Sequence, residues 1–279
     1  MSNFLTSAQV LDYTKESGVK KAKLPIKSTI LLSFLAGLFI ALAAVGSNII
    51  AHNIDDIGLA KYLAGLIFPA GLVFVVIAGA ELFTGNNLIS VAVLSKKVSL
   101  KKYFTNLSIV WLGNLVGSIF ISLLIFYSGH LEYTSGLLGA YTIKVGVVKT
   151  NLSFLNLFTS GILCNILVCL AVWMSYAAKD ISGKVLVIFF PIWLFIASGY
   201  EHSVANMYYI SAAMLAALDS NFVLLAQSHF NITNEALSNL SLYGMFIKNL
   251  IPVTIGNLVG GGFFVGTWYW WSYRNSTNF

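Results

Sequence analysis

Two short polar segments interrupt long apolar stretches of this 279-residue chain, and each carries a glutamate followed five residues later by an asparagine. The segments read Gly79-Ala80-Glu81-Leu82-Phe83-Thr84-Gly85-Asn86 and Gly199-Tyr200-Glu201-His202-Ser203-Val204-Ala205-Asn206. The hydroxyl of Thr84 and the imidazole of His202 can donate hydrogen bonds, and histidine also titrates near neutral pH. An ionisable residue inside an apolar stretch usually faces a cavity. The two segments therefore predict a polar site within an apolar setting.

The same residues also have structural interpretations. Glu81 and Glu201 can cap backbone amides that are freed where a helix restarts. Thr84 can bond back to its own helix, as Ser and Thr often do. His202 lies in a broken helix beside a glutamate, which favours a functional role over that of a satisfied core histidine.

Two further polar residues are candidates for this site. Asn165 lies inside an apolar segment, where a buried amide needs a partner, so it either joins helices or orients His202. Lys149 precedes that segment. Most lysines of this kind are simply solvated, but a lysine at the mouth of a cavity attracts anions.

The composition indicates that these residues lie in a membrane protein. The chain is 58% apolar and 9% charged, with a mean hydropathy of +0.83, whereas a soluble domain carries about 25% charged residues. Soluble enzymes, nucleic-acid-binding modules and disordered chains are therefore excluded. Buried ionisable residues are too few for a metal centre, and no cofactor is expected.

Six apolar segments are long enough to cross a bilayer. They cover residues 28–52, 59–95, 103–128, 154–178, 184–217 and 244–272. They show no period-2 alternation, which favours helices over a β-barrel. The prediction is an all-α membrane protein with three parts. These are an N-terminal segment (1–27), a membrane domain (28–272) and a C-terminal tail (273–279).

The lysines predict the orientation. With both termini in the cytoplasm, 12 of the 16 Lys and Arg residues lie inside, in agreement with the positive-inside rule. The four outside are Lys61, Lys144, Lys149 and Lys248. We expect a multi-pass protein of the cell membrane. The N-terminal Lys20-Lys21-Ala22-Lys23 cluster is interpreted as setting topology and touching anionic lipid, with a gate at the cytoplasmic mouth as the alternative.

The chain also contains an internal repeat. Asn106 and Gly113-Asn114-Leu115-Val116-Gly117 in the third segment recur as Asn249 and Gly256-Asn257-Leu258-Val259-Gly260 in the sixth, while the polar breaks match between the second and fifth. Two halves of three spans must have opposite orientations, as in many transporters. The glycines themselves are interpreted as close helix contacts. Two breaks at corresponding places point to a permeation site.

Other classes of membrane protein fit less well. An aquaporin or glycerol channel needs paired Asn-Pro-Ala half-helices, and the sequence has no Asn-Pro dipeptide. A sodium-coupled transporter usually has more spans. A membrane enzyme is disfavoured because neither HExxH nor Gly-x-Ser-x-Gly occurs.

Together these motifs resemble the formate/nitrite transporter family. The segment 197–207, the Leu82-Phe83-Thr84 break, Asn165 with 168–176, and 250–257 carry the resemblance. It implies an aquaporin-like protomer with broken second and fifth helices, and a homopentamer with one pore per protomer. It also implies that His202 is the central pore histidine, hydrogen-bonded to Thr84 and Asn165.

The resemblance assigns further roles. Lys149 would be the lysine of the vestibule, Glu201 would hold the fifth-helix break, and Glu81 would replace an aspartate of some formate channels. Two apolar constrictions would flank the histidine. The first would comprise Leu72, Leu82 and Phe195, and the second Phe68, Phe83 and Val168. By residue type alone these six are ordinary apolar side chains.

The expected function is passage of small monovalent weak-acid anions, with formate favoured and nitrite or hydrosulfide as alternatives. Anions would gather near Lys149, and polar donors would offset the cost of desolvation. A proton would then join the substrate, so that it passes as the neutral acid. Whether His202 transfers that proton or only tunes the local field stays open.

Overall fold

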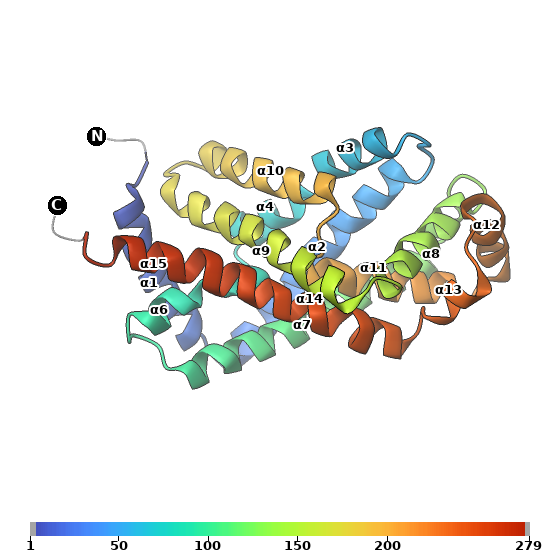
Figure 1. The fold of residues 1–279 in the computed structure, drawn as a ribbon. Coiled ribbons are helices and arrows are strands. Elements are labelled where there is room, and N and C mark those ends of the chain that lie inside the picture. The colour runs from blue at the N-terminus through green and yellow to red at the C-terminus, as the bar shows by residue number, and fades with distance from the viewer. Residues whose placement is uncertain (1–3, 277–279) are drawn as a thin grey trace.

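The computed structural model describes residues 4–276, and all of its regular elements are helical, as Figure 1 shows. In chain order they are α1 (Ser7–Lys23), α2 (Ile26–Ala51), α3 (Ile57–Ile67), α4 (Pro69–Ala78), α5 (Phe83–Asn86), α6 (Ile89–Leu94), α7 (Leu100–Tyr127), η1 (His130–Glu132), α8 (Leu137–Thr150), α9 (Phe154–Ala177), α10 (Ile181–Ser198), α11 (Ser203–Ala216), α12 (Ser220–Phe230), α13 (Asn234–Ser238), η2 (Gly244–Leu250), α14 (Ile251–Leu258), η3 (Val259–Thr267) and α15 (Trp268–Tyr273).

Six helical stretches of the described chain are long and apolar enough to cross a membrane. They are Ile26–Ala51, Ile57–Ala78, Leu100–Tyr127, Phe154–Ala177, Ile181–Ser198 and Gly244–Tyr273. Each falls within or close to a predicted segment, so the all-α prediction with six spans is confirmed. Helix α2 follows directly on Pro25 and begins two residues before the first predicted apolar segment. Residues 277–279 of the predicted tail lie outside the described residues.

The second and fifth segments are broken as predicted, and a glycine ends the helix that precedes each break. Gly79 follows α4 with φ of 83°, and Gly199 follows α10 with φ of 72°. This left-handed conformation is costly for residues with a Cβ atom, so glycine is the usual residue after a helix end. The helix restarts at Phe83 in one half and at Ser203 in the other.

The glycines of the repeated motif allow helices to pack closely, as predicted. A methyl group at Gly117 of α7 would lie 2.1 Å from the carbonyl oxygen of Phe34. In the other half, a methyl group at Gly260 of η3 would lie 2.3 Å from the carbonyl oxygen of Ile162. Neither contact leaves room for a side chain, so α7 packs directly on α2 and the last span packs on α9.

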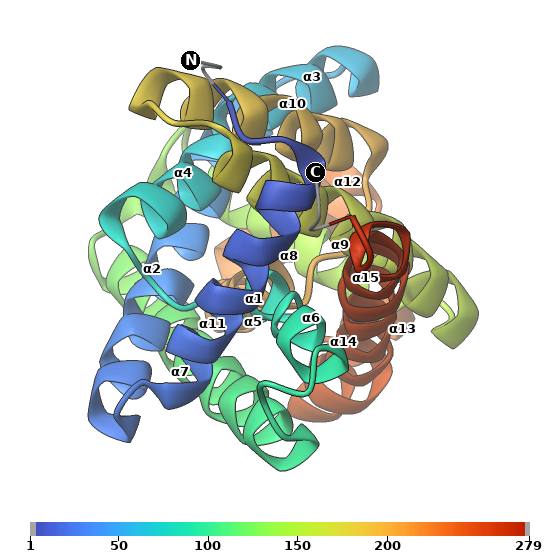
Figure 2. The same cartoon turned by 90° about the vertical axis from the view of Figure 1, so that its left-hand side faces the viewer.

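Both termini lie at one end of the molecule, and α12 and α13 lie at the other (Figure 1). Figure 2 shows α1 across the first end, beside α6. The bend of 111° between α11 and α12 was not predicted. Phe222 of α12 is buried against α8, so this pair of helices covers α8 at the far end.

Candidate functional site

Two buried asparagines hold the helix breaks. Asn114 of α7 accepts a hydrogen bond from the backbone N–H of Phe83 at 2.9 Å. Its amide nitrogen donates to the carbonyl oxygens of Ser33 at 2.7 Å and Glu81 at 3.0 Å. The groups of Phe83 and Glu81 lie at the break, where the asparagine replaces hydrogen bonds that a continuous helix would make. The Ser33 carbonyl belongs to α2, so Asn114 also ties the break to that helix.

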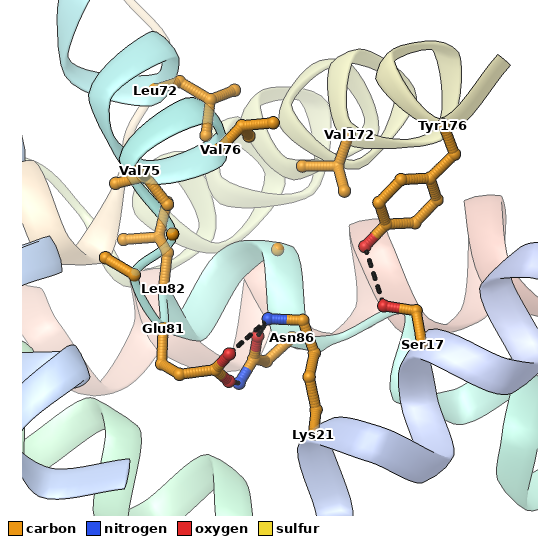
Figure 3. Close-up of a pocket in the computed structure, with 13 residues that line it drawn as sticks. Ser17, Lys21, Leu72, Val75, Val76, Glu81, Leu82, Asn86, Val172 and Tyr176 are labelled. Carbon is orange, nitrogen blue, oxygen red and sulfur yellow. Dashed lines mark hydrogen bonds and ion pairs between the residues drawn. The ribbon is translucent and has the colours of Figure 1, made fainter. Parts of the chain in front are cut away.

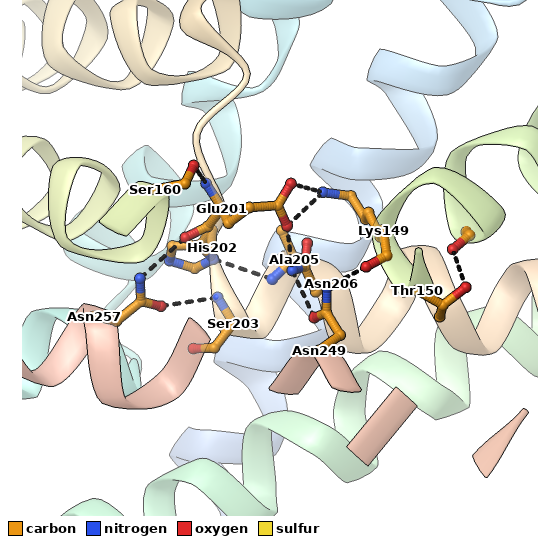
Figure 4. Close-up of polar contacts among 11 residues, drawn as sticks. Lys149, Thr150, Ser160, Glu201, His202, Ser203, Ala205, Asn206, Asn249 and Asn257 are labelled. Carbon is orange, nitrogen blue, oxygen red and sulfur yellow. Dashed lines mark hydrogen bonds and ion pairs between the residues drawn. The ribbon is translucent and has the colours of Figure 1, made fainter. Parts of the chain in front are cut away.

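Asn257 of α14 does the same for the other break. It accepts from the backbone N–H of Ser203 at 2.9 Å and donates to the carbonyl oxygen of Glu201 at 3.0 Å (Figure 4). It also donates to the carbonyl oxygen of Gly161 at 2.8 Å. Sequence reasoning had found the repeated Gly-Asn-Leu-Val-Gly motif but not this role of its asparagine. The signal was present, because a buried amide that recurs in two halves needs a recurring partner.

A buried lysine–glutamate pair lies beside the second break. Lys149 of α8 contacts both carboxylate oxygens of Glu201 at 3.0 Å (Figure 4). Asn206 donates to the same carboxylate at 2.6 Å and to the side-chain oxygen of Asn249 at 2.9 Å. Asn249 then donates to the backbone carbonyl of Lys149 at 2.9 Å. The charges therefore lie within a closed ring of hydrogen bonds, which a buried ion pair requires.

An equivalent pair lies beside the first break, and its lysine comes from α1. Lys21 contacts Glu81 at 2.6 Å and the side-chain oxygen of Asn86 at 3.0 Å (Figure 3). Asn86 donates to Glu81 at 2.6 Å and to Asn106 at 2.9 Å, and Asn106 donates to the carbonyl of Lys21 at 3.3 Å. The sequence prediction treated Lys21 as part of a surface cluster, so this role was missed.

The two pairs correspond residue by residue. Lys21 and Lys149 are 128 positions apart, as are Ser33 and Gly161. The carbonyl oxygens of Ser33 and Gly161 accept hydrogen bonds from Asn114 and Asn257. The helix pair α1–α2 is therefore repeated as α8–α9 without a gap. The N-terminal helix belongs to the inverted repeat rather than being an addition to it, and this equal spacing could have identified Lys21 from the sequence.

His202 and Thr84 bring the two breaks together. The ring Nε2 of His202 lies 2.9 Å from the hydroxyl oxygen of Thr84, and both residues are buried. The backbone N–H of Ala205 donates to Nδ1 of His202 at 3.0 Å. Because Nδ1 accepts, a neutral imidazole carries its proton on Nε2 and donates it to Thr84. The Thr84 hydroxyl is then free to donate its own hydrogen elsewhere.

Asn165 has other hydrogen-bond partners than the resemblance implies. It was expected to bond to His202, but its amide nitrogen donates to the backbone carbonyls of Thr84 at 3.3 Å and Asn257 at 2.6 Å. The unwound backbone at the breaks leaves carbonyl groups that need donors, and Asn165 supplies one. It positions Thr84 and reaches the histidine only through it.

The structural interpretations of the carboxylates and of Thr84 are corrected as well. The Glu81 and Glu201 carboxylates bind lysine and asparagine side chains. Asn114 and Asn257 accept hydrogen bonds from the freed backbone N–H groups instead. The hydroxyl of Thr84 bonds to His202 rather than to its own helix. The reason is spatial, since each carboxylate meets a lysine from another helix of its own half, and Thr84 meets His202 of the other half.

Two cavities adjoin these groups. The first, called here the Lys21 cavity, has a volume of about 250 Å³ and includes Leu72 and Leu82 in its wall. The second, the Lys149 cavity, has a volume of about 150 Å³ and includes Phe195 and His202. All six side chains expected at the constrictions are buried: Leu72, Leu82, Phe195, Phe68, Phe83 and Val168. The rings of Phe68 and Phe195 are 5.5 Å apart, and that of Phe195 is 5.9 Å from His202.

Lys61 of α3 is a further cation beside the Lys149 cavity. A methyl group at Gly199, which lines this cavity, would lie 3.1 Å from the Lys61 ammonium nitrogen. Within residues 4–276 no ion pair of Lys61 occurs. Since Lys149 and Glu201 neutralise each other, Lys61 adds a positive charge beside this cavity, a role that sequence reasoning did not give it.

Comparison with known proteins places this architecture in one family. The family model described as "Formate/nitrite transporter" matches residues 8–271. The formate channel FocA of Haemophilus influenzae is 37% identical over 264 residues, which cover 94% of this chain and 92% of the channel. FocA of Escherichia coli is 36% identical over 273 residues, with 96% and 94% covered.

A solved structure of a pentameric formate channel with formate bound matches the fold with a TM-score of 0.79 at 35% identity. The match covers 89% of this chain and 98% of the solved one. The sequence, the fold and the paired breaks therefore agree with the expected resemblance. The chain belongs to the formate/nitrite transporter family, and it is a multi-pass membrane channel or transporter for anions rather than an enzyme.

Proposed function

We propose that this protein passes formate across the membrane as a weak acid. The observation that supports this most directly is the Thr84–His202 hydrogen bond, which joins the two breaks between two cavities that each contain a lysine. The similar proteins named as formate channels favour formate. Nitrite and hydrosulfide are the alternatives within the family.

The first step is capture of the anion. Lys61 and Lys149 give the Lys149 cavity a net positive charge, because Glu201 balances only one of them. A positive cavity with low-dielectric walls concentrates anions. An ammonium group has three donors, and Glu201 takes two of those of Lys149, which leaves one for the substrate.

The second step is loss of charge. A bare anion crosses an apolar constriction only at a cost of many kcal/mol, whereas the neutral acid crosses at far lower cost. His202 is held with Nδ1 accepting from Ala205, so its neutral form donates to Thr84 and orients that hydroxyl toward a substrate. We infer that the captured anion takes its proton from the solvent at the Lys149 cavity and that His202 tunes the site without carrying that proton.

The apolar side chains form the barrier on both sides of this pair. Leu72 and Leu82, which line the Lys21 cavity, would form one constriction. Phe195, which lines the Lys149 cavity, would form the other with its neighbour Phe68, which differs from the grouping that the resemblance implies. Beyond the constriction of Leu72 and Leu82, the acid would enter the Lys21 cavity beside Lys21 and Glu81 and release its proton there. Each protomer would thus provide a complete pathway.

The assembly and orientation are part of the proposal. A homopentamer is supported by the solved relative, which is pentameric. The excess of lysines at the end of the molecule that holds both termini supports a cytoplasmic position for that end in the cell membrane. The Lys149 cavity is then the outer one.

The test is uptake of labelled formate, nitrite and hydrosulfide into proteoliposomes at two external pH values. Uptake is expected to be faster at the lower pH, because acid raises the fraction of neutral substrate. His202→Asn and Thr84→Val are each expected to slow uptake at least about tenfold, since each removes part of the donor pair. The ranking of the three substrates names the preferred one.

Two outcomes would contradict the proposal. Water or glycerol flux without anion uptake would exclude the weak-acid function. Normal uptake by Thr84→Val together with its loss in His202→Asn would show that the histidine acts on the substrate directly. Correct folding of both variants is checked by comparing their elution volume in size-exclusion chromatography with that of the wild type.

A further inference from the structure

Two polar side-chain atoms in the wall of the Lys149 cavity have no hydrogen-bond partner within the described chain. They are the amide nitrogen of Asn48 on α2 and the amide oxygen of Asn206 on α11. Both residues are more than nine-tenths buried. Buried amides are nearly always hydrogen-bonded, because a buried polar atom without a partner lowers stability. Two such atoms in one cavity indicate that something in the cavity pairs with them.

The orientation of Asn206 is determined by its neighbours. Its amide nitrogen donates to the carboxylate of Glu201 and to the side-chain oxygen of Asn249, and both of these are acceptors. The amide oxygen is therefore the atom left over. In the other half of the repeat the corresponding oxygen, on Asn86, accepts from Lys21. Lys149 instead gives two hydrogen bonds to Glu201, so the Asn206 oxygen stays available.

Asn48 has no such network. It is one turn before the end of α2, next to Ser47, whose hydroxyl already donates to the carbonyl of Ala64 at 3.0 Å. The repeat places Tyr176 at the matching position, 128 residues later, and Tyr176 lines the Lys21 cavity. Both halves therefore place a polar side chain at this position, in the wall of the cavity beside their lysine.

The groups in the Lys149 cavity match a small acid with two oxygen atoms. The ammonium of Lys149 and the amide N–H of Asn48 can each donate to one oxygen of the anion. After the acid is protonated, its O–H can donate to the oxygen of Asn206. Hydrosulfide has no oxygen, and sulfur is a weak hydrogen-bond acceptor, so it gains little from Asn48.

We propose that Asn48 is a substrate-binding residue that selects two-oxygen monoanions, of the carboxylate or nitrite type, over hydrosulfide. This inference rests on the proposed function, because it concerns the substrate of that pathway. Lys149 and Lys61 attract any anion, whereas Asn48 distinguishes anions by their acceptor atoms.

The experiment is to measure initial uptake of formate and hydrosulfide over a range of concentrations in proteoliposomes carrying wild type or Asn48→Leu. Leucine keeps the size and removes the donor. The KM for formate is expected to rise about tenfold, which is the effect of one hydrogen bond to a charged group, and the KM for hydrosulfide is expected to stay within about twofold. Asn156→Leu, an exposed asparagine at the start of α9, is the matched control and is expected to change neither value.

A conservative variant separates binding from structure. Asn48→Gln keeps the amide on a longer arm and is expected to recover part of the preference for formate. An equal change for both substrates in Asn48→Leu, or no change for either, would overturn the inference and show that the asparagine is structural or binds only water. Absence of any anion uptake by the wild type would instead contradict the proposed function.

Discussion

At the scale of single residues, the lysine–glutamate pairs are the charges that the membrane domain must keep together. The Lys149 and Glu201 side chains are 14% and 6% exposed. A buried pair contributes little net stability when intact, but removing one partner leaves the other charge buried alone. The closed ring of asparagines around each pair orients the carboxylate and prevents it from reaching water by rotating.

Lys149→Met is therefore expected to lower the unfolding temperature in detergent by roughly 5–10 °C, since breaking a buried pair costs about 3–5 kcal/mol. Adding Glu201→Gln in the same chain removes the isolated charge and is expected to restore part of this loss. Lys97→Met, on an exposed connection, serves as control. If the double variant unfolds no later than the single one, the isolated charge is not the cause.

At the scale of elements, each half of the repeat joins a broken helix to a long helix through one asparagine. Asn114 binds two backbone groups at the first break and one carbonyl of α2, and Asn257 binds two at the second break and one carbonyl of α9. Without them, the unwound segments would leave backbone groups unpaired at membrane depth. Thr84 and His202 keep their positions because the backbone that carries them is held in this way.

Asn114→Leu is expected to destabilise the protein by about 3 kcal/mol, because the asparagine's backbone partners lose their hydrogen bonds. Hydrogen exchange of residues 79–87 should become faster, while that of the second break should change much less. Asn257→Leu is the mirror-image experiment. Ser118→Ala, which removes only a hydrogen bond of 3.4 Å to Gly37, is expected to cost less than about 1 kcal/mol. Unchanged exchange at 79–87 would show that the asparagine does not hold the break.

At the scale of the whole molecule, the two cavities lie beside breaks from halves of opposite orientation. The repeat includes α1, which supplies Lys21 as α8 supplies Lys149. A helix whose lysines the sequence interprets as topology and lipid contacts thus completes the hydrogen-bonded ring around Glu81 at one cavity. Its contacts with α6, α9 and α15 hold it at the end of the molecule where both termini lie.

The orientation of the protein in the membrane can be tested with a thiol reagent that does not cross membranes. Cys164 and Cys169 are fully buried, so the wild-type chain is expected to stay unlabelled in intact cells. Asp55→Cys, between α2 and α3, should label in intact cells, whereas Lys97→Cys, between α6 and α7, should label only after the membrane is opened. The opposite pattern would place both termini outside.

Much of the fold could be predicted because its signals are local. Long apolar runs predict spans, and the glycines at 79 and 199 with the polar residues after them predict breaks. The repeated motif Gly-Asn-Leu-Val-Gly predicts the duplication. Each of these follows from the neighbours of a residue along the chain, because burial in lipid and helix termination depend on local sequence.

The partners within the site were decided by tertiary structure. Lys21 meets Glu81 across 60 positions, and Asn48 shares a cavity with Lys149 across about 100. Nearly uniform apolar helices have no polar face that would indicate which side meets which neighbour, so hydropathy cannot specify these contacts. The sequence by itself determined the spans, the breaks and the family of this protein. Only the packing of helices, within each half for the lysine networks and between the halves for Thr84 and His202, decided which side chains act together.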